Sequence, residues 1–225
     1  TASAVLHCAA DTVFSRPVDE ARRTNTDGTR HLLEVVDGWR RPVRLAHVST
    51  AFVAGRATGD IAERATDGAH GWVNGYEQSK WEAEALVRAH APDATILRSS
   101  TIVADVDGTV RQHNAVHRAL RAYHAGLAAM LPGTADRALD TVPGDWTCDA
   151  VARLALAPEA AGSTFHLCAG AGALPLDELL DRTWARWARE ESWRRRGVAR
   201  PAIADLETWT LFERSVHETG NARLA

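Results

Sequence analysis

The chain has 225 residues, 45% of them hydrophobic, which is enough to bury a substantial core in one domain plus a smaller appendage. The formal net charge of -3 argues against a general nucleic-acid binder, and no apolar run approaches the roughly 20 residues that span a bilayer. Since no secretory signal is present at the start, we expect a cytoplasmic protein with no nucleic-acid partner and no membrane span.

The first predicted elements are a strand that small residues follow and then a helix. Val5–Ala10 ends in two alanines, and small residues after a strand let a cofactor approach the backbone closely. Thr24–Thr29 then opens a helix that runs through His31–Val36.

The next predicted element is a buried parallel strand. The apolar run Val43–Val48 ends in Ser49 and Thr50, so the strand delivers a hydroxyl at its carboxyl end. A ligand crevice is expected at this edge of the sheet. A strand-end hydroxyl that bonds only to backbone is the alternative for Thr50.

Residues 55–75 are polar and rich in glycine, which predicts a loop before the next helix. On that helix Tyr76 and Lys80 are four residues apart, so phenol and ammonium share one face. A free tyrosine has a pKa near ~10 and is a reluctant acid at neutral pH unless a positive charge stabilises its phenolate. Lys80 can supply that charge, and Thr50 can donate a hydrogen bond to a carbonyl oxygen. An ordinary solvated helix is the alternative interpretation.

The later segments carry weaker signals. Residues 105–139 predict mainly helix, with His113, His117 and His124 near one stripe, but no third ligand stands at a convincing spacing and we expect no metal. The cysteines lie in apolar settings without CxxC spacing, which predicts buried reduced thiols: Cys8, Cys148 and Cys168. Residues 176–200 predict an arginine-rich helix with Trp184 and Trp187 on one side.

Five motifs occur in a fixed order along the chain: HCAA, NxxGT, HVSTAFVAG, YxxSK and ILRSSTIV. In this order the chain resembles an extended short-chain dehydrogenase/reductase from about residue 4 to about residue 168. The segments HCAADTVF, HVSTAFVAG and YEQSKWEAE resemble those of the fatty acyl-CoA reductase and thioester reductase branch, whose NAD-binding domain is of the male-sterility type.

The resemblance implies an α/β fold, a Rossmann-like doubly wound parallel sheet with a smaller, mostly helical substrate domain. Residues 139–146, the helix after them and the strand at Thr164 resemble the family segment that returns the chain to the sheet. The dinucleotide-binding part is therefore expected to comprise residues 1–104 and 140–169, and the substrate-binding part residues 105–139 and 170–225.

The same resemblance assigns roles residue by residue. The active-site hydroxyl falls on Thr50, five positions before Gly55, with Ser49 as the weaker candidate. The full catalytic set that it implies is Thr50, Tyr76, Lys80 and Asn25, with Asn25 supporting a proton-relay water. The implied cofactor contacts are Ala9, Ala10, Tyr76, Lys80, Ser99 and Ser100. Ser99 and Ser100 stand where the family usually has a proline near the nicotinamide.

The function that the resemblance implies is NAD(P)H-dependent reduction of an acyl thioester to an aldehyde or an alcohol. NADPH is the expected cofactor, with NADH as the alternative, and the thioester is held by an acyl or peptidyl carrier protein or by coenzyme A. The arginines of 176–200 are then either a docking face for an acidic carrier protein, a plain surface helix or a membrane contact. Other functions that stay open are a sugar-nucleotide epimerase or dehydratase and a non-catalytic relative that binds a partner.

One part of the family pattern is missing. A dinucleotide-binding domain begins with a strand, a glycine-rich turn and a helix that holds the pyrophosphate, and this sequence contains no such segment. We expect the sequence to be part of a longer enzyme. The alternatives are that the missing half is supplied elsewhere, or that the protein is degenerate and cannot bind a dinucleotide tightly.

Overall fold

The computed structural model describes residues 2–218 and divides into two compact units. One unit comprises the chain up to Ile102 together with Val142–Cys168. The other comprises Val103–Thr141 and the chain from Ala169 on. Both units are therefore built from two separate segments of the sequence. Within residues 2–218, no helix is both long and apolar enough to cross a bilayer.

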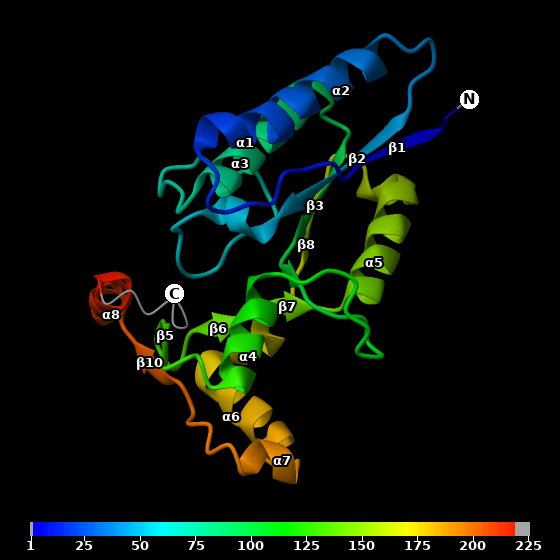
Figure 1. Cartoon of the computed structure of the whole chain (residues 1–225). Helices are drawn as coiled ribbons and strands as arrows, with labels where there is room; N and C mark the ends of the chain where they lie inside the picture. The colour runs from blue at the N-terminus through cyan, green and yellow to red at the C-terminus, as the bar shows by residue number, and fades with distance from the viewer. Residues whose placement is uncertain (1, 219–225) are drawn as a thin grey trace. The chain divides into compact units, whose positions relative to one another are not determined.

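The first unit is organised around a parallel sheet of four strands in the order β1-β2-β3-β8 (Figure 1). The strands are β1 (Ala4–His7), β2 (Arg44–Thr50), β3 (Thr95–Ser99) and β8 (Thr164–Leu167). In the register of the sheet His47 lies between His7 and Ile96. The predicted α/β fold with a parallel sheet is confirmed, and helices cover both faces of that sheet.

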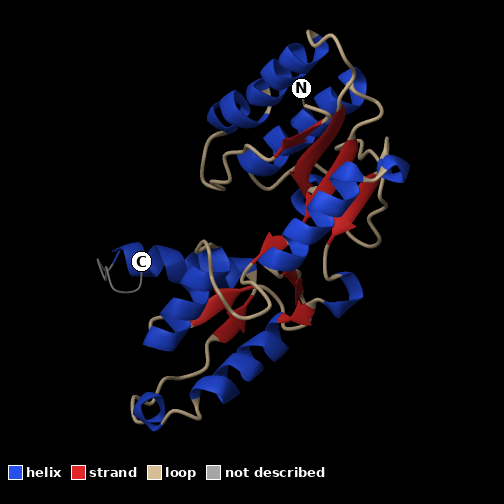
Figure 2. Cartoon of the chain, turned by 90° about the vertical axis from the view of Figure 1, so that its right-hand side faces the viewer, coloured by secondary structure: helices blue, strands red, loops and turns tan. Residues whose placement is uncertain are grey.

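Helices lie on the two sides of this sheet, as Figures 1 and 2 show. Helix α3 (Gly75–His90) packs on β2, and α1 (Val18–Asn25) and α2 (Asp27–Asp37) pack on α3. Helix α5 (Gly144–Leu156) packs on β1, β2 and β3 from the other side. The short elements of this unit are the 3-10 turns η1 (Ala51–Ala54) and η2 (Pro158–Ala160). Strands β4 (Thr101–Ile102) and β7 (Thr141–Val142) lie where the chain passes from one unit to the other.

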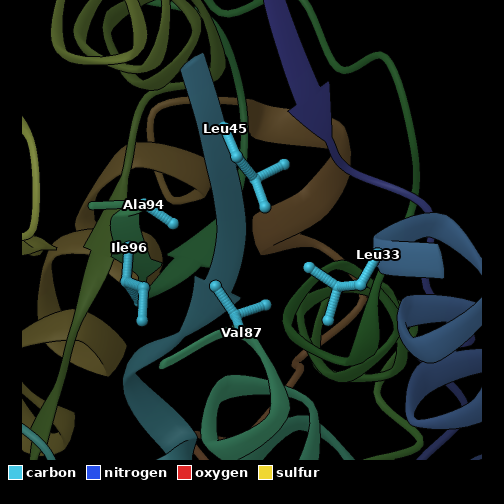
Figure 3. Close-up of a cluster of buried hydrophobic side chains, with 5 residues drawn as sticks. All are labelled: Leu33, Leu45, Val87, Ala94 and Ile96. Atoms are coloured by element: carbon cyan, nitrogen blue, oxygen red, sulfur yellow. The ribbon is translucent and has the colours of Figure 1, made fainter. Parts of the chain in front are cut away.

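The core of the first unit lies on both faces of the sheet. On the face of α3, the buried cluster consists of Leu33, Leu45, Val87, Ala94 and Ile96, whose side chains point toward one another in Figure 3. On the face of α5, Leu97 and Leu167 pack against Val151. Consecutive strand residues point to opposite faces, so Ile96 and Leu97 supply one core each.

The second unit combines short helices with two small sheets. Its helices are α4 (Ala115–Ala125), α6 (Leu176–Trp187), α7 (Glu191–Arg194) and α8 (Leu206–Glu218), and Gly170–Gly172 forms the 3-10 turn η3. The parallel sheet pairs β10 (Ala202–Ala204) with β5 (Met130–Pro132), and the antiparallel sheet pairs β6 (Ala138–Leu139) with β9 (Leu174–Pro175).

Two helix predictions are wrong in their extent. Only Ala115–Ala125 is helical within 105–139, because Gly126 adopts the left-handed conformation with φ 76° and ends α4. The helix predicted over 176–200 ends at Trp187, and the short α7 follows it. Helix α7 ends at Arg194, and the turn that follows it reaches Gly197, which has φ 62°.

Candidate active site

The first two site residues meet where β2 ends and α3 begins. Thr50 is the last residue of β2 and caps η1, where its hydroxyl accepts a hydrogen bond from the Phe52 amide at 3.2 Å. The Thr50 hydroxyl also hydrogen-bonds with the phenol of Tyr76, in the first turn of α3. Both side chains are buried, with 4% and 8% exposure. The structure therefore brings the predicted hydroxyl and the predicted phenol together.

The start of α3 is fixed by its cap and by a tight approach of α1. The Asn74 side chain accepts a hydrogen bond from the Glu77 amide, which satisfies one of the free N–H groups of the first turn. A Cβ on Gly75 would lie 2.7 Å from the Cα of Val18 and 2.8 Å from the Arg16 carbonyl oxygen. Glycine is thus required at the position directly before Tyr76.

The surroundings of Tyr76 keep its phenol protonated. Burial raises its pKa above the ordinary value, the hydrogen bond with Thr50 lowers it and Glu77 raises it. The ring of Phe14 stacks on the Tyr76 ring, with centroids 5.2 Å apart. The sequence predicts that Lys80 depresses the pKa of this phenol, but the pKa is raised, with burial as the largest cause. A phenol that stays protonated is a proton donor rather than a base.

Lys80 is directed toward β2. Its side chain is buried, and its Nζ donates a hydrogen bond to the Val48 carbonyl at 2.9 Å and lies 3.4 Å from His47 Nε2. Burial lowers the pKa of Lys80 to about 8, against the opposing effect of Glu84. A cationic amine that titrates close to neutral pH therefore lies one helical turn from Tyr76.

Asn25 joins the loop after β1 to helix α3. Its Oδ1 accepts from the Asp11 amide at 2.7 Å, and its Nδ2 donates to the Asp11 carbonyl at 3.0 Å and to Ser79 Oγ at 2.9 Å. Its main-chain carbonyl accepts from the Thr29 hydroxyl at 2.6 Å. With these partners, Asn25 positions the loop that contains Ala10.

The predicted cofactor contacts lie at the carboxyl ends of the strands. Ala9 and Ala10 follow β1, and Ser99 and Ser100 close and follow β3. Ser99 Oγ donates to the Ser100 carbonyl at 3.0 Å. The hydroxyls of Ser49 and Ser100 are buried, and neither has a hydrogen-bond partner among residues 2–218. Unsatisfied buried hydroxyls at this edge fit the polar contacts that a nicotinamide dinucleotide needs.

A buried ion pair connects α3 to β3. The Arg98 guanidinium donates to both oxygens of Glu84, from Nε at 2.9 Å and from Nη2 at 2.8 Å, and it also lies 3.3 Å from His166 Nε2. The two charged side chains are 1% and 3% exposed. Sequence reasoning missed this pair, although a lone arginine inside the apolar segment Thr95–Ser99 was a visible signal for a buried partner.

The predictions for the cysteines and for the histidines of residues 105–139 can be compared with the structure. Cys8 and Cys148 are exposed, so the expectation of buried thiols is wrong for them, while Cys168 is half-buried. His117 belongs to the cap of α4 and contacts His113, whereas His124 packs on Trp187, so the three histidines do not meet at one point. Within the part of the chain that the structure describes, no group of side chains has the composition of a metal site.

The loop of residues 55–75 is held at several points. The Trp81 indole of α3 donates to the Thr66 carbonyl at 2.9 Å and packs against Trp72, with ring centroids 4.8 Å apart. Glu63 accepts from the His166 amide of β8 at 2.6 Å. The loop prediction is confirmed, and the loop is anchored to both α3 and the sheet.

Comparisons with known proteins identify the family and the fold of the chain. The model of the family described as Male sterility protein matches residues 1–151. No curated protein matches the chain. Among solved structures, the terminal R domain of the myxalamid PKS-NRPS biosynthetic pathway is 26% identical with a TM-score of 0.76, over 98% of this chain and 54% of that one.

Two further solved structures are similar in fold. A thiolation-reductase di-domain from an archaeal non-ribosomal peptide synthetase is 19% identical, with a TM-score of 0.70 over 96% of this chain and 58% of that one. The UDP-glucuronic acid 4-epimerase of Bacillus cereus in complex with NAD is 18% identical, with a TM-score of 0.70 over 90% of this chain and 63% of that one. The chain thus spans less than two thirds of each of these structures, and the fold is Rossmann-like.

Proposed function

The chain belongs to the Male sterility protein family, a family of extended short-chain dehydrogenases/reductases, and from this premise we propose that it is an NADPH-dependent reductase of acyl thioesters. The observation that carries the proposal is the contact between two buried groups, the Thr50 hydroxyl and the Tyr76 phenol, one turn from the buried Lys80. This set can polarise a carbonyl oxygen and protonate it.

We propose that a nicotinamide dinucleotide is held by Ala9, Ala10, Ser99 and Ser100 together with Tyr76 and Lys80. When bound, it supplies the hydride that reduces the thioester carbonyl to a hemithioacetal. In the structure the Thr50 hydroxyl accepts from the Phe52 amide and hydrogen-bonds with Tyr76. When substrate binds, the Thr50 hydrogen turns to the substrate oxygen, where it stabilises the developing negative charge. Tyr76 gives its phenolic proton to that oxygen.

The remaining chemistry follows from the hemithioacetal. Its carbon–sulfur bond breaks, the sulfur leaves with the hydroxyl proton as a thiol, and an aldehyde forms. Once Tyr76 has regained a proton from solvent and a fresh reduced dinucleotide is bound, a second hydride and a second proton would give the alcohol. Tyr76 suits both rounds because burial raises its pKa and keeps the acid form populated at neutral pH.

We propose a carrier-bound thioester as the substrate. The structures titled as a terminal R domain and as a thiolation-reductase di-domain support this choice. The docking face expected over 176–200 has less support, because several of its arginines form i,i+4 ion pairs with glutamates. These pairs are Arg182 with Glu178, Arg186 with Glu190 and Arg195 with Glu191.

Replacement of Tyr76 by phenylalanine tests the proposal. Loss of the proton donor should reduce thioester-dependent NADPH oxidation about 10²- to 10⁴-fold. The sequence has one other tyrosine, Tyr123, whose buried hydroxyl has no hydrogen-bond partner within residues 2–218, so Tyr123→Phe is the matched control and should stay within about twofold. The assay follows absorbance of NADPH and release of free thiol from an acyl-pantetheine. Equal rates in both variants would contradict the assignment of Tyr76.

A further inference from the structure

Two histidines of the sheet lie next to the candidate catalytic lysine. His7 of β1 and His47 of β2 are register partners, and their rings are 5.1 Å apart. His47 is 0% exposed, and its Nε2 lies 3.4 Å from the Nζ of Lys80. The two histidines have no part in the proton transfer proposed above, so their burial next to a cation requires an explanation.

The hydrogen bonds of Thr29 settle the protonation of His7. The Thr29 hydroxyl donates its single hydrogen to the Asn25 carbonyl, which can only accept a hydrogen bond. At 2.9 Å from His7 Nε2, the Thr29 oxygen must therefore be the acceptor, and His7 carries its hydrogen on Nε2. Burial, and then Lys80, lowers the pKa of His7, so this ring is neutral.

The protonation of His47 follows from its neighbours. Burial is the main cause that holds the pKa of His47 well below its ordinary value, and Lys80 and His7 lower it further. The ring is therefore neutral and has one acceptor nitrogen. Since an ammonium can only donate, the acceptor must be Nε2, and the hydrogen of His47 lies on Nδ1.

We propose that His47 is a positioning residue for the reductase, whose Nε2 accepts a hydrogen bond from Lys80 and fixes the ammonium beside the Val48 carbonyl. Lys80 has three donor hydrogens, and these two acceptors on β2 take two of them. The third stays available for a ligand. A neutral acceptor holds the amine in its charged form without cancelling the charge that the site needs.

The other groups that face Lys80 cannot replace His47. Glu84, one turn further along α3, raises the pKa of Lys80, but both its oxygens already accept from Arg98. Cys8, after β1, also acts on Lys80 electrostatically, and Tyr76 lies one turn before it on α3. His47 is thus the side-chain acceptor that contacts Nζ directly within the described part of the chain.

A titration of Lys80 tests the proposal without any activity measurement. Lys80 is the single lysine of the 225-residue sequence, so protein labelled with ¹³Cε-lysine gives one lysine resonance whose shift follows its protonation. In the unsubstituted protein we expect a midpoint at about 8. His47→Gln places an amide oxygen near the position of Nε2, and the midpoint should stay within a few tenths of a unit.

His47→Asn is the matched variant, with the same amide on a side chain too short to reach Nζ. It should lower the midpoint by about one pKa unit, since a hydrogen bond to a charged group is lost. Thr95→Val serves as a control for general destabilisation, because Thr95 is buried in the same sheet and donates to the Ala160 carbonyl, and it should leave the midpoint unchanged. Identical midpoints in the glutamine and asparagine variants would overturn the proposal.

The catalytic meaning of His47 rests on the proposed function, and a second measurement separates the two. In thioester reduction, the alkaline limb of the kcat profile should shift with the lysine midpoint in His47→Asn and return in His47→Gln. A lysine midpoint that moves while no thioester is reduced would refute the reductase and keep the His47 contact. Thioester reduction together with the same lysine midpoint in all variants would keep the reductase and refute the His47 contact.

Discussion

The buried ion pair between Glu84 and Arg98 allows a quantitative test of how α3 is held on the sheet. The perturbation is Glu84→Gln, which keeps the shape of the side chain and removes its charge. Arg98 would then retain one amide oxygen and His166 as partners, inside a site where both side chains are 3% exposed or less. Arg88, which lies 3.5 Å from the same carboxylate, would lose this ion pair and keep its hydrogen bond to the Thr164 hydroxyl.

The magnitude follows from the geometry. Removing one partner of a fully buried ion pair leaves an uncompensated charge and costs about 3–5 kcal/mol of unfolding free energy. The glutamine oxygen restores one of the two hydrogen bonds, each worth about 1.5–3 kcal/mol when charged, so we expect a net loss of about 2 kcal/mol. In a domain of this size that corresponds to a fall in Tm of roughly 4–8 °C.

Chemical unfolding followed by fluorescence measures the loss. The matched variant replaces both partners with apolar residues, Glu84→Leu with Arg98→Met, which leaves no fully buried charge unpaired, since Arg88 is 28% exposed. Exchange of a whole buried pair for apolar side chains is often neutral, so this double variant should be more stable than Glu84→Gln alone. A loss below about 1 kcal/mol for Glu84→Gln, or a double variant less stable than the single one, would refute the reasoning.

The remaining predictions concern the pH profile, the start of α3 and the loop after β1. The rate of thioester reduction should fall as pH rises through about 8, because Lys80 loses its proton there while the raised pKa of Tyr76 keeps the phenol protonated. Lys80→Arg should remove this fall from the pH dependence of kcat, since arginine stays charged. Gly75→Ala should cost about 1–3 kcal/mol in urea unfolding because its Cβ meets the backbone of Val18, whereas Gly38→Ala, with 3.6 Å of clearance and a helical φ of −71°, should be neutral or slightly stabilising. Asn25→Ala should lower the free energy of unfolding by about 2–4 kcal/mol, because the main-chain amide and carbonyl of Asp11 lose their hydrogen-bond partner. Unchanged stability in thermal melts would contradict the positioning role of Asn25.

The parts of the site that local sequence pattern predicts are those that depend on neighbours along the chain. The apolar run before Thr50 predicts a buried strand, and the spacing of Tyr76 and Lys80 predicts one helix face. The sequence pattern predicts these features because side-chain directions repeat every two residues in a strand and every 3.6 residues in a helix. The parallel pairing of β1 with β2 follows from the same pattern once a helix separates the two strands.

The parts that sequence reasoning missed depend on contacts between distant segments. Asn25 bonds to Asp11, 14 residues away, and to Ser79, 54 residues away, and no local pattern encodes those partners. The pKa of Tyr76 was expected to fall beside Lys80, whereas burial, a property of the folded chain, raises it. His47 lies within a motif that the sequence displays plainly, but its role depends on where the side chain of α3 ends.

Because Lys80 is buried, proteolysis can report how often helix α3 detaches from the sheet. A protease that cuts only after lysine has one target bond in this sequence, and that bond lies within α3, where the side chain is 2% exposed. Cleavage there requires the helix to detach from β2, so the rate of cutting reflects how often the candidate active site opens. The appearance of a single pair of fragments then measures how often the site opens, in a protein with no label and no substitution.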